Sequence, residues 1–163
     1  MKRLLILRHA KSSWNDASLS DWERPLNDRG RRDAPRVGEW LRHHSRQPDV
    51  IITSDAVRAR TTAEAVAKAA GYSREIVIEP SLYHATPKAV LDLLTAGRDE
   101  AQTVLIVGHN PGLEELVRQL TGEHHVLATA ALVELEVPIG HWSELDLTIA
   151  ASVLQTWHPG DRP

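Results

Sequence analysis

The 163-residue chain contains no cysteine. This absence excludes disulfide bonds, thiolate nucleophiles and cysteine-ligated metal sites. Because nothing in such a chain calls for an oxidising compartment, we expect a cytoplasmic protein. Phenylalanine is also absent, and that absence has no functional interpretation.

Long apolar runs and an excess of positive charge are missing as well. The formal net charge is −3 at pH 7, which argues against a general nucleic-acid or anionic-membrane surface, since both partners require clustered positive charge. No segment is long enough to span a bilayer. Met1-Lys2-Arg3 before an apolar run imitates a signal peptide, but Arg8 interrupts that run too early. We therefore expect no nucleic-acid partner and no membrane association.

What the chain does contain is an average globular composition. Hydrophobic residues make up 42% and charged residues 25%, as in ordinary soluble domains. At this length we expect one domain over residues 1–163, with a single core and a single site. We find no internal repeat, low-complexity tract or linker.

Strand and helix patterns alternate along most of the chain. Apolar runs predict buried strands, and apolar stripes of helical period follow them. The predicted strands are 4–7, 49–53, 75–79 and 103–107, and the predicted helices lie after Asn27 to about 44, from 55 to 70, from 87 to 94 and from 112 to about 120. Asn27 and Ser54 can cap the first two helices, Gly71 ends the second, and Pro35 should distort the first or delay its start.

The last part of the chain changes character. Residues 131–137 alternate with Glu134 and Glu136 outward, and 145–149 alternate again, which predicts two strands joined by a turn at 138–140. The whole pattern indicates an α/β fold with a mainly parallel sheet and an antiparallel C-terminal addition.

Three predicted strand exits carry cationic or imidazole groups. Arg8 and His9 follow the first strand, Arg58 comes just after the second, and His109 follows the fourth. Parallel strands deliver such residues to one edge of the sheet. Arginine matches phosphate oxygens with two donors, and a helix N-terminus adds oriented amides. The pattern therefore predicts a phosphoryl-binding site, and we favour Arg58 over the nearby Arg60 as its arginine.

Three segments together resemble the histidine phosphatase superfamily. The segments are Leu7-Arg8-His9-Ala10 followed by Ser12, Trp14 and Asn15; the stretch from Ser54 to Ala63; and Gly108-His109-Asn110-Pro111. Ala10 replaces the usual glycine of the first motif. The small size is most similar to the SixA-type phosphohistidine phosphatases. The resemblance implies a phosphoglycerate mutase-like, three-layer α/β/α sandwich.

The resemblance also implies roles for individual residues. His9 would be the nucleophile, Arg8, Arg58 and His109 would bind the phosphoryl oxygens, and Asn15 matches a phosphate-contacting asparagine. The further candidates for substrate binding are Ser12, Arg24 and His84. The resemblance implies a mechanism that passes through a phosphohistidine, which water hydrolyses, with no metal and no cofactor. The adjacent histidine pairs at 43–44 and 124–125 lack metal-ligand spacing, so we interpret them as solvated helix ends.

One feature of the larger family members is missing. They place a glutamate acid after the third strand, to protonate an alcohol leaving group, whereas residues 80–86 contain no carboxylate. His84, Glu79, Asp92 or water remain open as the proton donor.

The missing acid favours a substrate whose leaving group is readily protonated. The absence of room for a lid between Arg58 and His109 favours an open site that admits a protein side chain. Its expected substrate is protein phosphohistidine or a related phosphoramidate. Alternatives are a phosphatase of small phosphorylated substrates such as sugar phosphates, a zinc hydrolase, and a non-catalytic phosphoryl-binding module.

Overall fold

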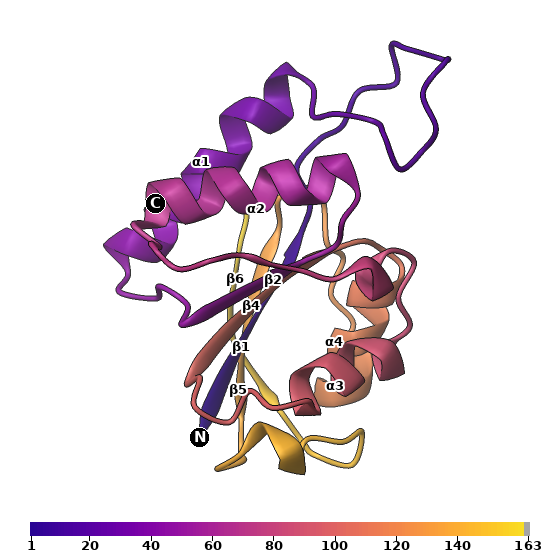
Figure 1. Cartoon of the computed structure of the whole chain (residues 1–163). Helices are drawn as coiled ribbons and strands as arrows, with labels where there is room; N and C mark the ends of the chain where they lie inside the picture. Colours follow the sequence, from indigo (N-terminus) through magenta and orange to yellow (C-terminus); the bar gives the residue numbers. More distant parts are fainter. Residues whose placement is uncertain (162–163) are drawn as a thin grey trace.

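Six strands form one sheet at the centre of the fold. The computed structural model describes residues 1–161, and its sheet has the order β3-β2-β4-β1-β5-β6 (Figure 1). The first four strands in this order, from β3 to β1, are parallel to one another. Strand β5 runs antiparallel to β1, and β6 runs antiparallel to β5. The strands are β1 (Lys2–Arg8), β2 (Val50–Thr53), β3 (Val77–Ile78), β4 (Thr103–Gly108), β5 (Leu132–Val137) and β6 (Ser152–Trp157).

Two helices cover each face of this sheet. The pair α1 (Asp28–His43) and α2 (Val57–Ala70) lies on one side, and α3 (Pro87–Thr95) and α4 (Gly112–Thr121) lie on the other (Figure 1). The short 3-10 helices are η1 (Pro80–Leu82) and η2 (Trp142–Glu144). The predicted three-layer sandwich with a mainly parallel sheet is therefore confirmed.

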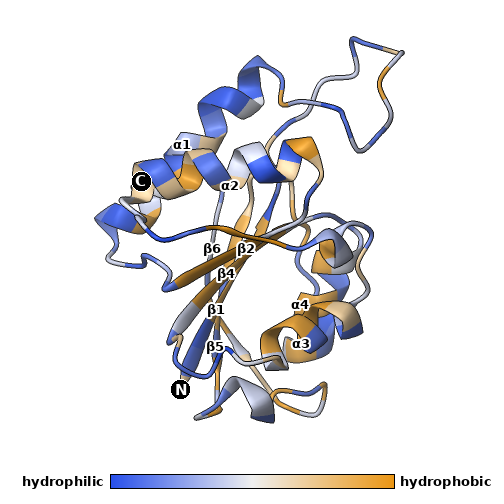
Figure 2. Cartoon of the chain, in the orientation of Figure 1, coloured by the Kyte–Doolittle hydropathy of each residue, from blue (hydrophilic) through white to orange (hydrophobic). Residues whose placement is uncertain are grey.

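The strand β1 holds the layers together because it is apolar on both faces. Leu5 and Leu7 pack into the core under α1 and α2, whereas Leu4 and Ile6 pack into the core under α3 and α4. All four are fully buried, which stabilises the fold by about 1.5–3 kcal/mol for each such side chain. Figure 2 shows the central strands as the most hydrophobic part of the chain and α1 as largely hydrophilic. A buried central strand fixes the position of the residues that follow it.

The C-terminal hairpin differs from the prediction. The partner of β5 is Ser152–Trp157, not 145–149, and a loop rather than a tight turn joins them. The apolar and polar residues alternate here because Leu145 packs into the core from the loop. The polar Asp146 instead stabilises the loop, since its carboxylate accepts from the Thr148 backbone N–H. Trp142 anchors the loop, since its buried indole N–H donates to the Ala101 carbonyl at 2.7 Å. The alternating pattern there belongs to a loop with buried anchors.

Local details correct four more predictions. Pro35 does not delay α1, because the Asn27 side chain caps the helix by accepting from Gly30 N–H. Ser54 does not cap α2, whose N-cap is Ala56. The third strand is only the edge pair Val77–Ile78. Glu134 points inward and is buried, held by Arg3 and Arg46 at 3.2 Å and 2.9 Å.

Within residues 1–161, no helix combines the length and apolarity needed to cross a bilayer.

Candidate active site

His9 lies at the carboxyl end of β1 with its ring held in one tautomer. Its backbone N–H donates to the Gly108 carbonyl at 3.0 Å, so β4 fixes the main chain. The Nδ1 atom lies 2.7 Å from the Ala10 carbonyl oxygen. Because a carbonyl oxygen only accepts, Nδ1 carries the proton and Nε2 keeps its lone pair. This arrangement is what a nucleophilic imidazole requires.

Arg58 lies in the first turn of α2 and reaches the same atom. Its Nε donates to His9 Nε2 at 3.4 Å. Both terminal nitrogens donate to Asp21, Nη1 to the carbonyl at 2.6 Å and Nη2 to the carboxylate at 2.9 Å. The side chain is 5% exposed. The guanidinium therefore presents its Nε edge to His9.

His109 follows β4 and lies beside His9, with ring centroids 5.2 Å apart. Its Nε2 lies 2.8 Å from Ser54 Oγ, and that oxygen also accepts from the Ala56 N–H. Among the described contacts of residues 1–161, His109 Nε2 is the one acceptor for the Ser54 hydroxyl proton, so the hydroxyl donates to Nε2 and neutral His109 carries its proton on Nδ1. Within residues 1–161 this buried Nδ1 has no hydrogen-bond partner. It is available to donate to an anion.

Arg8 completes the group from the last position of β1. Its Nη1 donates to the Leu127 carbonyl at 3.0 Å, and its buried Nε has no partner in the described part of the chain. Burial lowers the pKa of this arginine, the charge of Glu114 raises it, and that of Arg58 lowers it again. The structure therefore brings Arg8, Arg58 and His109 together near His9, and their predicted role in binding phosphoryl oxygens stays a prediction.

Both site histidines are neutral at pH 7. Burial is the main cause that lowers the pKa of His9 to about 3, with His109, Arg58 and Arg8 adding repulsion. Burial, followed by the charge of Arg58, lowers the pKa of His109 to about 4. A neutral His9 can attack phosphorus, and a neutral His109 can still donate one hydrogen bond.

Asp21 and Tyr83 are site residues that the sequence analysis missed. The Tyr83 hydroxyl donates to the carboxylate that binds Arg58. This hydrogen bond holds the pKa of Asp21 well below its usual range, with Arg58 and Arg24 adding to the effect. Burial and then Asp21 raise the pKa of Tyr83. The only available signal was the position of Asp21 in the polar loop, three residues before Arg24.

Three predicted substrate-binding residues lie in the loop between β1 and α1, and none of their contacts within residues 1–161 is to the His9 side chain. The Arg24 guanidinium lies 3.5 Å over the Trp14 ring and donates to Ser12 Oγ at 2.7 Å and to the Asp21 carboxylate. Asn15 is exposed, and its described contact is a backbone donation to Ser13 Oγ. Ser12 and Arg24 thus organise the loop, which reaches the site through Asp21.

The three residues named as candidate proton donors have different surroundings in the structure. The His84 ring packs at a tilt against Tyr83, with ring centroids 4.0 Å apart. Tyr83 also meets the His109 ring edge-on, with centroids 5.5 Å apart. Glu79 lies 3.9 Å from Arg98, and exposed Asp92 pairs with Lys88 at 3.1 Å. Of the three, His84 alone borders the site.

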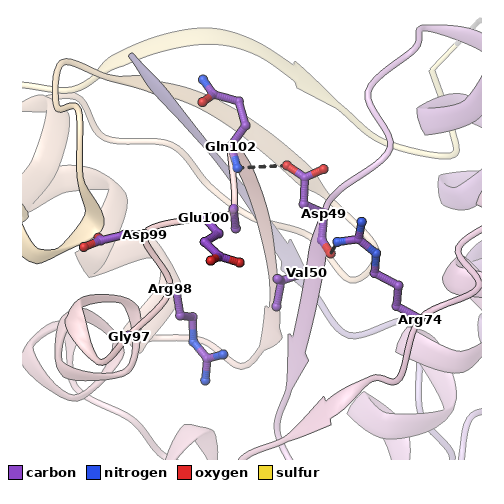
Figure 3. Close-up of a pocket in the computed structure, with 9 residues that line it drawn as sticks. Asp49, Val50, Arg74, Gly97, Arg98, Asp99, Glu100 and Gln102 are labelled. Atoms are coloured by element: carbon purple, nitrogen blue, oxygen red, sulfur yellow. Dashed lines mark hydrogen bonds between the residues drawn. The ribbon is translucent and has the colours of Figure 1, made fainter.

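A large cleft of about 640 Å³ lies elsewhere, at the amino ends of β2 and β4 (Figure 3). Its arginines already have protein partners, since Arg74 donates to the Asp49 carbonyl and Arg98 to the Leu93 carbonyl. His9 and His109 follow the opposite ends of their strands. Within residues 1–161, no three His, Cys, Asp or Glu side chains are grouped to hold a metal.

Comparison with known proteins agrees with this geometry. A family model described as Histidine phosphatase superfamily (branch 1) matches residues 4–84. An uncharacterized chloroplastic protein of Arabidopsis thaliana is 34% identical over 155 residues, covering 88% of this chain and 70% of the relative.

Two solved structures share the whole fold. One is a protein of Agrobacterium tumefaciens proposed to be the phosphohistidine phosphatase SixA, with 27% identity, a TM-score of 0.82, and coverage of 97% of this chain and 98% of that one. The other, with the same proposed assignment in Nakamurella multipartitia, has 29% identity, a TM-score of 0.84, and coverage of 98% and 97%. The predicted family and the predicted phosphatase class are confirmed: the chain belongs to the histidine phosphatase superfamily and is a phosphatase enzyme.

Proposed function

We propose that the protein is a metal-independent phosphohydrolase that acts through a phosphohistidine on His9. The observation that carries this proposal is the unprotonated Nε2 of His9. The hydrogen bond from Nδ1 to the Ala10 carbonyl fixes this tautomer, and the Nε2 lone pair accepts from Arg58 Nε. Nε2 attacks phosphorus while the bond to the leaving group breaks and its electron pair departs with that group. Water then attacks phosphorus and restores His9 with release of inorganic phosphate.

Donors for the transferring group come from the chain itself. Arg8, Arg58 and the Nδ1–H of His109 would bind the equatorial oxygens and stabilise their charge in the transition state. Their contacts to protein carbonyls, Asp21 and Ser54 hold them in place before substrate arrives. Preorganised donors of this kind need no rearrangement during the reaction.

The groups around the site favour phosphohistidine as substrate. An alkoxide leaving group needs an acid, yet Asp21 is ionised and Tyr83 holds its proton against that carboxylate. Glu79 and Asp92 pair with Arg98 and Lys88. An imidazole leaving group takes its proton readily from solvent, so a site without an acid can still cleave a P–N bond. The two structural neighbours proposed as SixA support the same substrate class.

His84 favours one alternative, a phosphatase of small phosphomonoesters such as sugar phosphates. It borders the site through Tyr83 and would then protonate the leaving oxygen. Fast hydrolysis of a phosphosugar, lost in His84→Ala, would support that function. The cytoplasmic location expected from the composition stays a prediction.

The decisive test is hydrolysis of a phosphohistidine peptide and p-nitrophenyl phosphate with chelator present, with acid-labile phosphoenzyme trapped in parallel. We expect His9→Ala to lose trapped phosphate and at least ~10³-fold in activity. Arg58→Ala should lose about 100-fold. Arg60→Ala is the matched control, since Arg60 is partly exposed and pairs with Glu64.

Loss of activity on chelation, with no trapped phosphate, would instead indicate a metal hydrolase. Binding of phosphate with no turnover of either substrate would indicate a phosphoryl-binding module. Each result contradicts the proposed mechanism.

A further inference from the structure

A second hollow lies directly beside His109, between the loop before α3 and the start of α4. We propose that it receives the side chain that gives up its phosphoryl group, and that Glu115 makes it selective for an imidazole leaving group. This inference rests on the proposed function and adds the determinant of substrate class. The hollow is lined by His84, Ala85, Thr86, Pro87, His109, Asn110, Pro111, Gly112 and Glu115.

The position of the hollow suits a leaving group. His109 lines it and also lies 5.2 Å, centroid to centroid, from the His9 ring. A phosphoryl group that contacts both histidines would therefore adjoin the hollow. The substrate side chain bonded to that phosphorus would need space of this kind on the side away from His9, because attack is in line.

The size of the hollow suits a single side chain. Its volume is about 210 Å³, below the ~300–1,000 Å³ typical of pockets for whole small-molecule ligands. Close backbone packing sets this width: a Cβ atom on Gly112 would lie 2.2 Å from the Ala85 carbonyl oxygen. The walls include the apolar groups of Ala85, Pro87 and Pro111, which match the faces of an imidazole ring.

The charge of the hollow distinguishes it from the phosphoryl site. Glu115 has a side chain that is 48% exposed, and Arg118 and Gln119 both donate to its Oε1. Its Oε2 is therefore able to accept from a ligand. In phosphohistidine the second ring nitrogen bears no hydrogen until it takes a proton from water, and its N–H then donates to Oε2. The protonated ring leaves as neutral imidazole, because the electron pair of the broken P–N bond returns to the nitrogen that carried phosphorus.

A carboxylate would stabilise such a leaving group and would repel a developing alkoxide or phenolate. Cationic donors at the phosphoryl group and a carboxylate beyond it therefore match the charge distribution of phosphohistidine. The same arrangement disfavours phosphate esters.

The test compares wild type, Glu115→Gln and the control Glu64→Gln on two substrates. Glu64 is an exposed glutamate on α2 that pairs with Arg60, so its substitution removes the same charge elsewhere. We expect Glu115→Gln to lower kcat/KM for a phosphohistidine peptide about tenfold, as for loss of a charged hydrogen bond. In Glu115→Gln, hydrolysis of phenyl phosphate should be unchanged or faster, and inhibition by vanadate should be unchanged. Glu64→Gln should hydrolyse both substrates as fast as wild type does.

Three outcomes would overturn the inference. They are unchanged peptide hydrolysis in Glu115→Gln, an equal loss on both substrates, and a loss confined to phenyl phosphate. The failure of the proposed function is a different observation, because wild type itself would then not hydrolyse the peptide or form phosphoenzyme.

Discussion

The Arg58 guanidinium is bound on two sides by Asp21, through the backbone carbonyl at 2.6 Å and the carboxylate at 2.9 Å. These contacts occupy both terminal nitrogens and direct Nε towards His9. Asp21 comes from the loop between β1 and α1, which projects at the top of Figure 1. The loop is thereby connected to the phosphoryl site by one acidic residue.

We expect Asp21→Ala to lower kcat by about 10- to 100-fold, because the loss of charged hydrogen bonds worth ~1.5–3 kcal/mol frees the Arg58 guanidinium. Steady-state kinetics on the phosphohistidine peptide would measure this. Asp16→Ala is the control, since Asp16 lies in the same loop and its carboxylate binds only Ser18 among the described contacts. Equal activity of the two variants would show that Asp21 does not position Arg58.

We expect Ser54→Ala to lower kcat about tenfold by releasing His109. Ser54 Oγ donates to Nε2 at 2.8 Å and fixes the proton on Nδ1, and losing an orienting partner of this kind typically costs ~1 kcal/mol or more. Nitrogen-15 shifts of the His109 ring would report the tautomer. An unaltered tautomer in Ser54→Ala would contradict this assignment.

We expect stability to fall as the pH drops below 6.5. In the unfolded chain His9 and His109 take up protons around their ordinary pKa of 6.5, whereas in the folded protein they do so only near 3 and 4. The unfolded state therefore binds more protons between these values, and each ring contributes a slope of up to about 1.4 kcal/mol per pH unit. Denaturant melts from pH 7 to pH 4 measure the slope. In His9→Gln the slope should be smaller, and an identical slope would contradict the assignment.

We expect Gly30→Ala to lower the free energy of unfolding by at least ~2 kcal/mol, as for overpacking in a core. A Cβ atom at Gly30 would lie 2.1 Å from the Lys11 carbonyl oxygen, on the backbone of the loop that carries Asp21. Gly140→Ala is the control, because its nearest contact would be a side-chain oxygen at 3.6 Å. Urea melts of both variants would show whether the close approach is required.

The sequence predicted those features that depend on local pattern. The run Leu4–Leu7 is buried as β1, the Asn27 cap begins α1, and Gly71 ends α2 in the left-handed region. Parallel strand order then brings His9 and His109 to one sheet edge, because β1 and β4 are neighbours in register. Patterns of this kind need no knowledge of distant contacts.

Features that depend on long-range partners were not predictable. Glu134 is buried with two charged partners, Arg3 from β1 and Arg46 from the connection between α1 and β2. Asp21 meets Arg58 and Tyr83, residues 37 and 62 positions away in the sequence. Likewise, Leu145 is buried by packing against distant parts of the chain. The alternating pattern around it therefore resembles that of a strand although the segment is a loop. The types of side chain and their spacing in the sequence do not predict which distant residues pair in the fold.

The unpartnered donors of the site have a consequence for the whole fold. Arg8 Nε and His109 Nδ1 are buried without acceptors in the described part of the chain, and burial of unpaired donors costs free energy. An anion that accepts from both would relieve this cost and stabilise the folded state by mass action, by about 2.7 kcal/mol at one hundred times its dissociation constant. Inorganic phosphate is both the product and an anion of this kind. The enzyme would thus resist heat better when its own product occupies the site. Because bound product also blocks the site, a rise in phosphate concentration would inhibit the enzyme and protect it from unfolding at the same time.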